Sequence, residues 1–180
     1  MSHTRKQLEK WLKTIDVKGE VIDIGGLVWP VEGRTKSWNV SKYIIVDIKK
    51  THRGREADYV EDLNIETKLL WIADIAFCLE VLQFVWNPVD VLLNINAMLR
   101  RDGVLYLTSH FLFPNHKGTD YLRYSRDGIT KLLEETGFKI EEIVPMESAN
   151  PKALWKFLEG EAKVQKFPYE IGHLIKARRI

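Results

Sequence analysis

Three aspartates stand where short apolar stretches of the sequence end. Asp23 precedes the glycine pair of VIDIGG, Asp47 closes YIIVDI, and Asp62 lies in VEDL. A carboxylate that follows a second strand, about 20 residues beyond a glycine turn, is well placed to accept hydrogen bonds from ribose hydroxyls. A single Asp after a strand is more often a turn or helix cap. The three together indicate a binding site for a ribose-bearing cofactor.

The glycine turn limits which cofactor this is. The nicotinamide fingerprint G-x-G-x-x-G, started at Gly25, requires glycines at the positions of Leu27 and Pro30, and a start at Gly26 does no better. The phosphate loop G-x-x-x-x-G-K-[ST] does not occur in the sequence either. The sequence therefore argues against both kinds of nucleotide loop. The glycines are followed instead by LVWP, which contains Trp29.

A second group of chemically active side chains follows the stretch VLYLTS. His110 and His116 are candidate general bases, because an unperturbed imidazole titrates near neutral pH. Asp120, Tyr121 and Arg123 are candidate substrate contacts in the same segment, which is dense in polar and aromatic residues, as substrate loops are. We expect this segment to lie over the reactive end of the bound cofactor.

Each of these residues also has a purely structural interpretation. His110 could point into the end of a sheet as a hydrogen-bonded core residue, and His116 could be an ordinary loop residue. Arg123 could pair with Asp120 and order the loop instead of clamping a substrate. Tyr121 is more typical of packing than of ligand binding. These alternatives stay open at the level of the sequence.

Alternating strands and helices are expected to position these residues. Apolar residues at helical spacing predict a helix over 5–14, and Pro88 in a first turn supports another over 88–100. Ser125 can cap a third helix that ends at Gly137, and KALWKFLEGEA is a fourth. Short apolar or β-branched runs predict strands around an irregular stretch over 28–42. The strands are expected at 19–26, 42–48, 57–63, 74–78, 104–111, 138–144 and 169–178.

This alternation predicts an α/β fold, doubly wound around a mostly parallel sheet with helices on both faces. The segment after Cys78 is expected to become helical, and RDG at 101–103 is expected to form a turn after a helix that ends near Arg100 and Arg101. In such sheets ligands bind beyond the carboxyl ends of the strands. Glu80 stands at one of these ends.

The composition is that of an ordinary globular chain. Its 180 residues favour one domain, and 27 basic against 25 acidic side chains leave a net charge of +2, which is too small to imply a nucleic-acid partner by itself. No apolar run approaches the roughly 20 residues that span a bilayer, and no signal peptide is visible, so a cytoplasmic location away from membranes is expected. Cys78 is the one cysteine, and no spacing of His and acidic residues indicates a metal site.

Five segments, in the correct order, resemble the motifs of the class I, seven-stranded, S-adenosylmethionine-dependent methyltransferases. VIDIGG is similar to the opening of the first motif, YIIVDI to the second, and VEDL to the segment after the third strand. ADIAFCLEVLQFV resembles the fourth-strand segment F-D-x-V-x-x-x-E-V-L-E-H-V, and NAMLRRDGVLYLTS resembles the helix, turn and strand that follow. DYLRYSRDGITKLLEETGFKIEEI and the closing YEIGHLIKAR also look like regions of this family, so the resemblance covers nearly the whole chain.

The resemblance implies a seven-stranded sheet with an antiparallel final strand, in one domain. An N-terminal helix would span 1–18, a cofactor-binding half 19–110 and a substrate-side half 111–180. The implied cofactor is S-adenosylmethionine, with Asp47 on the ribose and Asp62 on the adenine amino group. A small molecule is expected as the methyl acceptor, because the chain carries almost no insertion beyond the core fold. The implied cofactor-binding residues are Asp23, Gly25, Gly26, Asp47, Ile48, Asp62, Leu63 and Leu79.

The sequence departs from the family at two places. Leu27 and Trp29 replace the later glycines of the first motif, and Gln83 and Phe84 stand where relatives often carry Glu and His. These departures favour a second hypothesis, a non-catalytic binding or scaffolding protein of the same fold, which the three retained aspartates oppose. A third hypothesis is a nucleic-acid methyltransferase, but the sequence lacks the Asn/Asp-Pro-Pro-aromatic motif that amino-methylating enzymes of this kind carry after the fourth strand. Trp29 and Trp38 flank the glycine turn and could cover the site. Methylation on oxygen or nitrogen, and a monomer or a homodimer, remain open.

Overall fold

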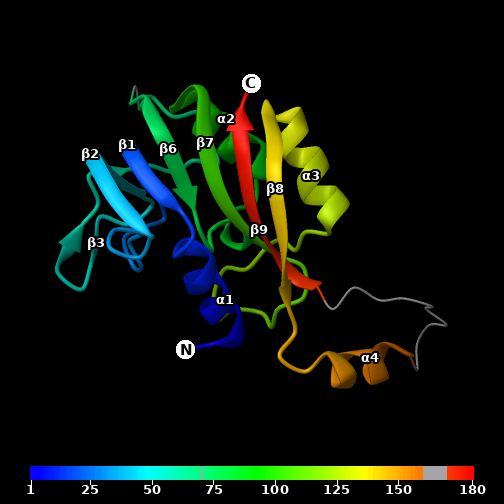
Figure 1. Ribbon diagram of the computed structural model, residues 1–180. Coiled ribbons are helices and arrows are strands. Elements are labelled where there is room, and N and C mark those ends of the chain that lie inside the picture. The colour runs from blue at the N-terminus through cyan, green and yellow to red at the C-terminus, as the bar shows by residue number, and fades with distance from the viewer. Residues whose placement is uncertain (70, 160–169) are drawn as a thin grey trace.

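The computed structural model describes residues 1–69, 71–159 and 170–180, and its centre is a seven-stranded sheet (Figure 1). The strand order is β5-β2-β1-β6-β7-β9-β8. The first five strands in this order are parallel to one another, whereas β9 is antiparallel to both of its neighbours. This confirms the predicted fold class. The strands are β1 (Asp16–Ile24), β2 (Ser37–Asp47), β5 (Tyr59–Val60), β6 (Ala73–Cys78), β7 (Leu99–His110), β8 (Phe138–Glu147) and β9 (Glu170–Arg179).

Helices cover both faces of the sheet, as predicted (Figure 1). On one face the apolar stripe of the first helix packs on the sheet through Leu8, Trp11 and Leu12. On the other face two helices bury Leu92 and Leu133 in a separate cluster. The helices are α1 (His3–Leu12), α2 (Pro88–Ala97), α3 (Arg126–Glu135) and α4 (Pro151–Glu159). The last residues of the predicted fourth helix, 160–162, lie outside the described residues.

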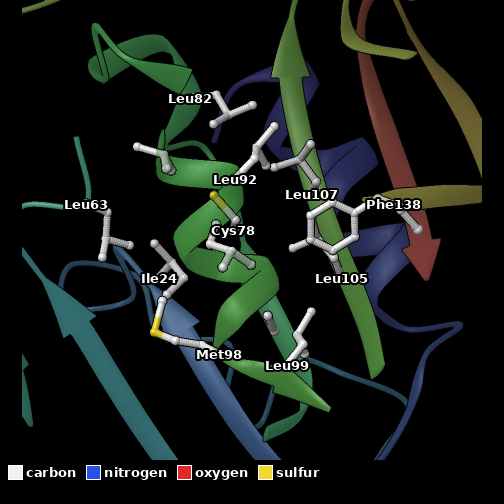
Figure 2. Packing of buried hydrophobic residues seen from close by; sticks show 14 of the residues in the cluster. Ile24, Leu63, Cys78, Leu82, Leu92, Met98, Leu99, Leu105, Leu107 and Phe138 are labelled. Atoms are coloured by element: carbon white, nitrogen blue, oxygen red, sulfur yellow. The ribbon is translucent and has the colours of Figure 1, made fainter. Parts of the chain in front are cut away.

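The larger of the two clusters surrounds α2 (Figure 2). Ile24 from β1, Cys78 from β6 and Leu105 from β7 meet the helix from the sheet, and Phe138 closes the cluster from β8. These strands are apolar on both faces because helices cover the sheet from both sides. The cluster fixes the strand ends, from which the candidate site is built.

Local signals confirm the predicted start of α2 and both predicted ends of α3. The Ser125 hydroxyl accepts a hydrogen bond from the Gly128 amide at 3.1 Å and so caps α3. Gly137, just beyond that helix, has a φ of 80°, which is the left-handed conformation that ends helices. Pro88 occupies the first turn of α2, and Asn87 caps it.

Between β1 and β6 the structure differs from the elements predicted from the sequence. Strand β2 starts at Ser37, inside the stretch predicted to be irregular, because Trp38 and Val40 alternate with exposed residues and pack on the α1 cluster. Residues 25–36 join β1 to β2 without a helix, so the expected alternation of strands and helices fails there. A small hairpin, β3 (Thr51–His52) and β4 (Arg55–Glu56), was not predicted.

Two further predictions of local structure were wrong in part. RDG at 101–103 lies within β7, as an irregularity where Asp102 takes a φ of 63° and the register with β6 shifts. Arg100 therefore belongs to a strand and not to the end of α2, and it pairs with Asp74 at 2.6 Å. After Cys78 the chain forms only one 3-10 turn, η1 (Leu82–Phe84), because Glu80 interrupts the backbone with a φ of 61°.

Candidate functional site

The turn after β1 joins the carboxyl ends of three strands. The amide of Gly25 donates a hydrogen bond to the carbonyl of Val46, at the end of β2, at 2.8 Å. A Cβ on Gly25, whose φ is 71°, would lie 2.5 Å from a methyl of Val81, just beyond β6. A Cβ on Gly26 would lie 2.3 Å from the carboxyl carbon of Asp23. Both positions therefore require glycine, and the turn is tightly enclosed by its own neighbours.

Asp23 supports this turn from beneath. Its carboxylate accepts hydrogen bonds from the Val31 amide at 2.8 Å and from the Tyr43 hydroxyl at 2.5 Å, and only 2% of the residue is exposed. Burial raises the pKa of Asp23 to about 6, although the hydrogen bonds from Tyr43 and Val31 oppose the rise. Asp23 thus shapes the loop rather than offering its carboxylate to solvent.

The other two aspartates offer free oxygens. Asp47, at the end of β2, accepts one bond through Oδ1 from the Lys49 amide at 3.0 Å. Asp62 accepts two bonds through Oδ1 from Asn64, at 3.0 and 2.8 Å. Within the described residues, Oδ2 of neither carboxylate accepts a hydrogen bond. Two carboxylate oxygens are therefore available at this edge, as a site for hydroxyl and amino donors requires.

The apolar residues predicted beside these acids differ in exposure. Ile48 is 62% exposed, directly after Asp47, and Leu63 is buried in the core beneath Asp62. Leu79 is half-buried against the α1 cluster at the end of β6. Ile48 thus offers an apolar surface to a ligand, whereas Leu63 mainly supports the loop.

The LVWP segment does not fill the site. Leu27 is fully buried, but Trp29 is 65% exposed, with the Arg5 guanidinium 4.7 Å from its ring centroid. Trp29 is therefore free to contact a ligand. Trp38 lies near the start of β2, at the opposite end from Asp47, so the expectation that it could cover the site is wrong.

An ion-pair network ties this segment to α1. Glu9 accepts hydrogen bonds from Arg5 at 2.8 Å and from Arg34 at 2.8 and 3.2 Å. Arg34 also donates to the carbonyls of Trp29 and Pro30, at 2.8 and 3.2 Å. One guanidinium thus fixes the backbone of the segment to the N-terminal helix.

Glu80 is a functional candidate that the sequence marked by its position after a strand and by its match to the Glu of the fourth-strand motif. Its Oε2 lies 2.8 Å from Nε2 of His110, its Oε1 accepts a bond from the Thr108 hydroxyl at 3.1 Å, and its side chain is 27% exposed. Burial opposes ionisation, but the bonds from His110 and Thr108 and the charge of Arg5 outweigh it and lower the pKa of Glu80. Glu80 therefore presents a negative charge to the site.

His110 lies behind Glu80. Its side chain has no exposed surface, and Nδ1 has no partner among the described residues. The ring nitrogen that faces Glu80 is Nε2, at 2.8 Å from Oε2. His110 thus orients Glu80, close to the structural interpretation given above.

His116 and Asp120 form the second polar pair. Nδ1 of His116 lies 3.2 Å from Oδ2 of Asp120, which also accepts the His116 amide at 2.7 Å. Arg123 binds both oxygens of Asp120, at 2.5 and 2.7 Å, and lowers the pKa of that carboxyl far below its usual range. The His116 side chain is 29% exposed, and within the described residues its Nε2 has no partner. Arg123 is committed to ordering the loop.

Aromatic rings join the two polar pairs. Phe113 stacks on His110 at 4.4 Å and on His116 at 5.1 Å, and Phe84 meets His116 edge-on at 4.9 Å. The chain after β7 is anchored on η1, where the Tyr121 amide donates to the Gln83 carbonyl at 2.7 Å. Tyr121 itself is 55% exposed. The predicted substrate segment therefore does lie beside the end of β6.

Two open hollows lie in the described part of the chain. One, of about 500 Å³, lies between Val28 and the β3–β4 hairpin. The other, of about 300 Å³, lies between Arg126, Glu170 and His173. Neither is lined by Asp47, so the predicted cofactor site is not one of these hollows.

Across the described residues, no three His, Cys, Asp or Glu side chains gather as metal ligands, and no helix is long and apolar enough to cross a membrane.

No protein-family model and no curated protein matches the chain. Solved structures do match it. An S-adenosylmethionine dependent methyltransferase from Mesorhizobium loti aligns with a TM-score of 0.64 at 14% identity, over 98% of both chains. The N-methyltransferase NodS from Bradyrhizobium japonicum gives 0.62 at 14%, over 98% of this chain and 96% of NodS. The cyclase SpnF gives 0.62 at 13%, over 96% and 80%.

Proposed function

We propose that this chain, which has the fold of the class I S-adenosylmethionine-dependent methyltransferases, binds S-adenosylmethionine and transfers its methyl group to oxygen or nitrogen of a small molecule. One observation carries the proposal: the glycine turn after β1 and the free carboxylate oxygens of Asp47 and Asp62 follow neighbouring strands at one edge of the sheet. Ligands of such sheets bind at this edge.

The residues at this edge fit an adenosyl cofactor. Asp47 would accept hydrogen bonds from the ribose hydroxyls and Asp62 one from the adenine amino group, each through the oxygen that the protein leaves free. Ile48 would pack against the base, and the turn at Gly25 and Gly26 would let the backbone approach the methionine portion. The cofactor supplies an electrophilic methyl group on a sulfonium. The half of the chain over 19–110 would therefore bind the cofactor.

The half over 111–180 would serve the acceptor. His116 is the stronger candidate for the base, because its Nε2 is open to a ligand while Asp120 holds Nδ1 and so fixes the ring and its tautomer. It would take the proton of the attacking hydroxyl or amine at Nε2. Arg123 acts through Asp120 as a positioning residue, and Tyr121 is exposed to contact the acceptor.

Glu80 adds charge selection to the acceptor site. A carboxylate whose pKa is lowered is a weak base, but it attracts a positively charged or N–H-bearing group. His110, which is buried, would hold Glu80 in place and would not contact the acceptor. The base and the anionic contact thus come from two different strand ends.

The rival function is a non-catalytic protein of the same fold. SpnF, which is described as a cyclase, is one fold relative whose name is not that of a methyltransferase. The substituted residues Gln83 and Phe84 favour the rival by sequence. Gln83 donates to the Glu80 carbonyl at 2.9 Å and Phe84 packs on His116, so both would support the candidate residues of the proposed site.

Calorimetric titration with S-adenosylmethionine and its demethylated product tests the proposal. We expect binding, and Asp47→Ala should weaken it by about 1–3 kcal/mol, the range of a charged hydrogen bond. Glu134→Ala, an exposed acid on α3, is the matched control and should bind as the parent does. No heat of binding at millimolar ligand would contradict the enzyme and support the rival. An unchanged affinity in Asp47→Ala would mean that the ribose lies elsewhere.

A further inference from the structure

The β3–β4 hairpin carries a dense positive charge. Lys49, Lys50, Arg53 and Arg55 fall within seven residues, together with His52, although the whole chain has a net charge of only +2. Among the described residues none of the five forms an ion pair, and the acid of the hairpin, Glu56, stands opposite Thr51. Many of the chain's other arginines are paired. Four uncompensated cations at this spacing repel one another, which is a cost without an anionic partner.

The turn of the hairpin is built around an arginine. His52 and Arg55 are paired across the ladder, so the turn has two central residues, Arg53 and Gly54, with φ of 48° and 83°. Positive φ at both positions is the type I′ turn, which favours Asn-Gly. An arginine there is not explained by the turn, because a side chain with a Cβ is strained at positive φ.

Two of these cations, Arg53 and Arg55, line an open cavity together with His52. The hollow of about 500 Å³ is lined by His52, Arg53, Gly54 and Arg55 from the hairpin and by Val28 from the LVWP segment. Arg55 donates to the Leu27 carbonyl at 3.4 Å and so links the hairpin to that segment. One wall is thus cationic and the other is apolar, with Val28 42% exposed. Its volume lies in the range of small-ligand sites.

We infer that this cavity binds the phosphate group of a small molecule, at a site beside the proposed cofactor edge and away from the acceptor segment. Arginine forks bind phosphate oxygens in pairs, and the exposed apolar wall suits the carbon body of the ligand. A nucleic acid is disfavoured, because the cationic stretch is seven residues long on a chain that is otherwise balanced in charge. The hairpin follows β2, whereas the acceptor segment follows β7, with β1 and β6 between them.

Titration of the protein with pyrophosphate, followed by calorimetry and by amide NMR shifts, tests the inference. We expect saturable binding at constant ionic strength, with the largest shifts at residues 28 and 52–55. The double variant Arg53→Asn and Arg55→Gln should bind about tenfold or more weakly. Asn is favoured in this turn, so the change at residue 53 should not lower the melting temperature of the variant below that of the parent. Arg101→Gln, exposed and unpaired among the described residues, is the control and should bind within about twofold of the parent.

Each outcome decides the question. Binding that does not saturate by about 10 mM pyrophosphate would overturn the site. An equal loss of affinity in the Arg101→Gln control would also overturn it. Equal binding of acetate would show a general charge effect and also overturn it. A single-stranded oligonucleotide that binds far more tightly than pyrophosphate, with a steep salt dependence, would replace the small ligand by a nucleic acid. The inference does not depend on the cofactor: the same calorimeter can find pyrophosphate binding without S-adenosylmethionine binding, or the reverse.

Discussion

The carboxyl group of Asp23 makes the stability of this protein depend on pH in an unusual direction. Its folded pKa of about 6 lies above the ordinary value of 3.8, because burial disfavours the charged form. Between these two values the folded state holds more protons than the unfolded state. The contribution of Asp23 to stability is therefore largest below pH 4 and is lost as the pH rises toward 6.

Asp23→Asn isolates this effect, since the amide oxygen can still accept from Val31 and Tyr43. Relative to the parent, we expect the variant to gain about 2 kcal/mol in free energy of unfolding when the pH is raised from 4.5 to 7. Urea unfolding at several pH values measures the difference. The pKa of Glu80 and Glu141 is lowered, so these residues contribute in the opposite direction, but they are common to both proteins. Parallel curves for the two proteins would show that Asp23 is already ionised at low pH.

His116 carries the second prediction at this scale. His116→Gln removes the open imidazole nitrogen while leaving the cofactor edge untouched, so affinity for the demethylated cofactor should stay within about twofold. Turnover of any acceptor should fall about 10²–10⁴-fold, the usual share of a general base. His110→Gln should weaken turnover less, because His110 is buried behind Glu80. The reverse order of the two effects would make His110 the base.

The residues of the site could be predicted to different degrees. The positions of Asp47 and Asp62 at the ends of neighbouring strands could be predicted, because strand ends and glycine turns have sequence signals. The role of Asp23 could not be predicted, because it depends on Tyr43, which only the fold brings near. The pairing of Arg123 with Asp120, three residues away, was one of the two interpretations left open by the sequence, and the structure shows it as a bidentate contact. Glu80 matched the Glu of the fourth-strand motif, but its pairing with His110 had no sequence signal, since His110 is 30 residues away.

At the scale of elements, the helix α1 and the LVWP segment behave as one unit through Arg34. Arg34→Ala would leave Glu9 with Arg5 alone and free the carbonyls of Trp29 and Pro30. We expect a loss of about 1–3 kcal/mol in free energy of unfolding, and faster hydrogen exchange over 27–34. Arg34→Lys should restore little, because an ammonium cannot bind the carboxylate and both carbonyls at once.

A neighbouring ion pair provides the control. Lys36 and Asp16 lie 2.8 Å apart, but both side chains are about 60% exposed. Lys36→Ala should therefore cost about 0.5 kcal/mol or less. Equal losses in the two variants would show that Arg34 contributes only as a surface charge.

Elements with strong local signals were predicted, and those defined by packing were not. The cap at Ser125 and the stop at Gly137 placed α3 closely. The hairpin over 51–56 was missed because Arg-Gly is not a usual turn pair, and β2 was cut short because Trp38 and Val40 stand among polar residues. Both errors arise where tertiary contacts outweigh local preference.

At the scale of the whole molecule, the apolar periodicity of the sequence does not predict the order of the strands in the sheet. The last strand of the chain, β9, lies between β7 and β8, and the sequence predicted an antiparallel final strand only through its family resemblance. The C-terminal strand β9 therefore lies inside the sheet, with β7 on one side and β8 on the other. By contrast, β5 forms an edge and pairs with β2 over two residues only.

Matched proline substitutions should reveal this difference. Ile175 is fully buried and lies opposite Leu107 on one side and Ile143 on the other, so Ile175→Pro removes a backbone N–H from a strand inside the sheet and an apolar side chain from the core. We expect this variant to lose its cooperative unfolding transition. Tyr59→Pro in β5 should keep a cooperative transition with a modest loss of stability, because edge strands tolerate proline. Circular dichroism during urea unfolding distinguishes the two, and a cooperative Ile175→Pro variant would mean that the first five strands and their helices fold without β9.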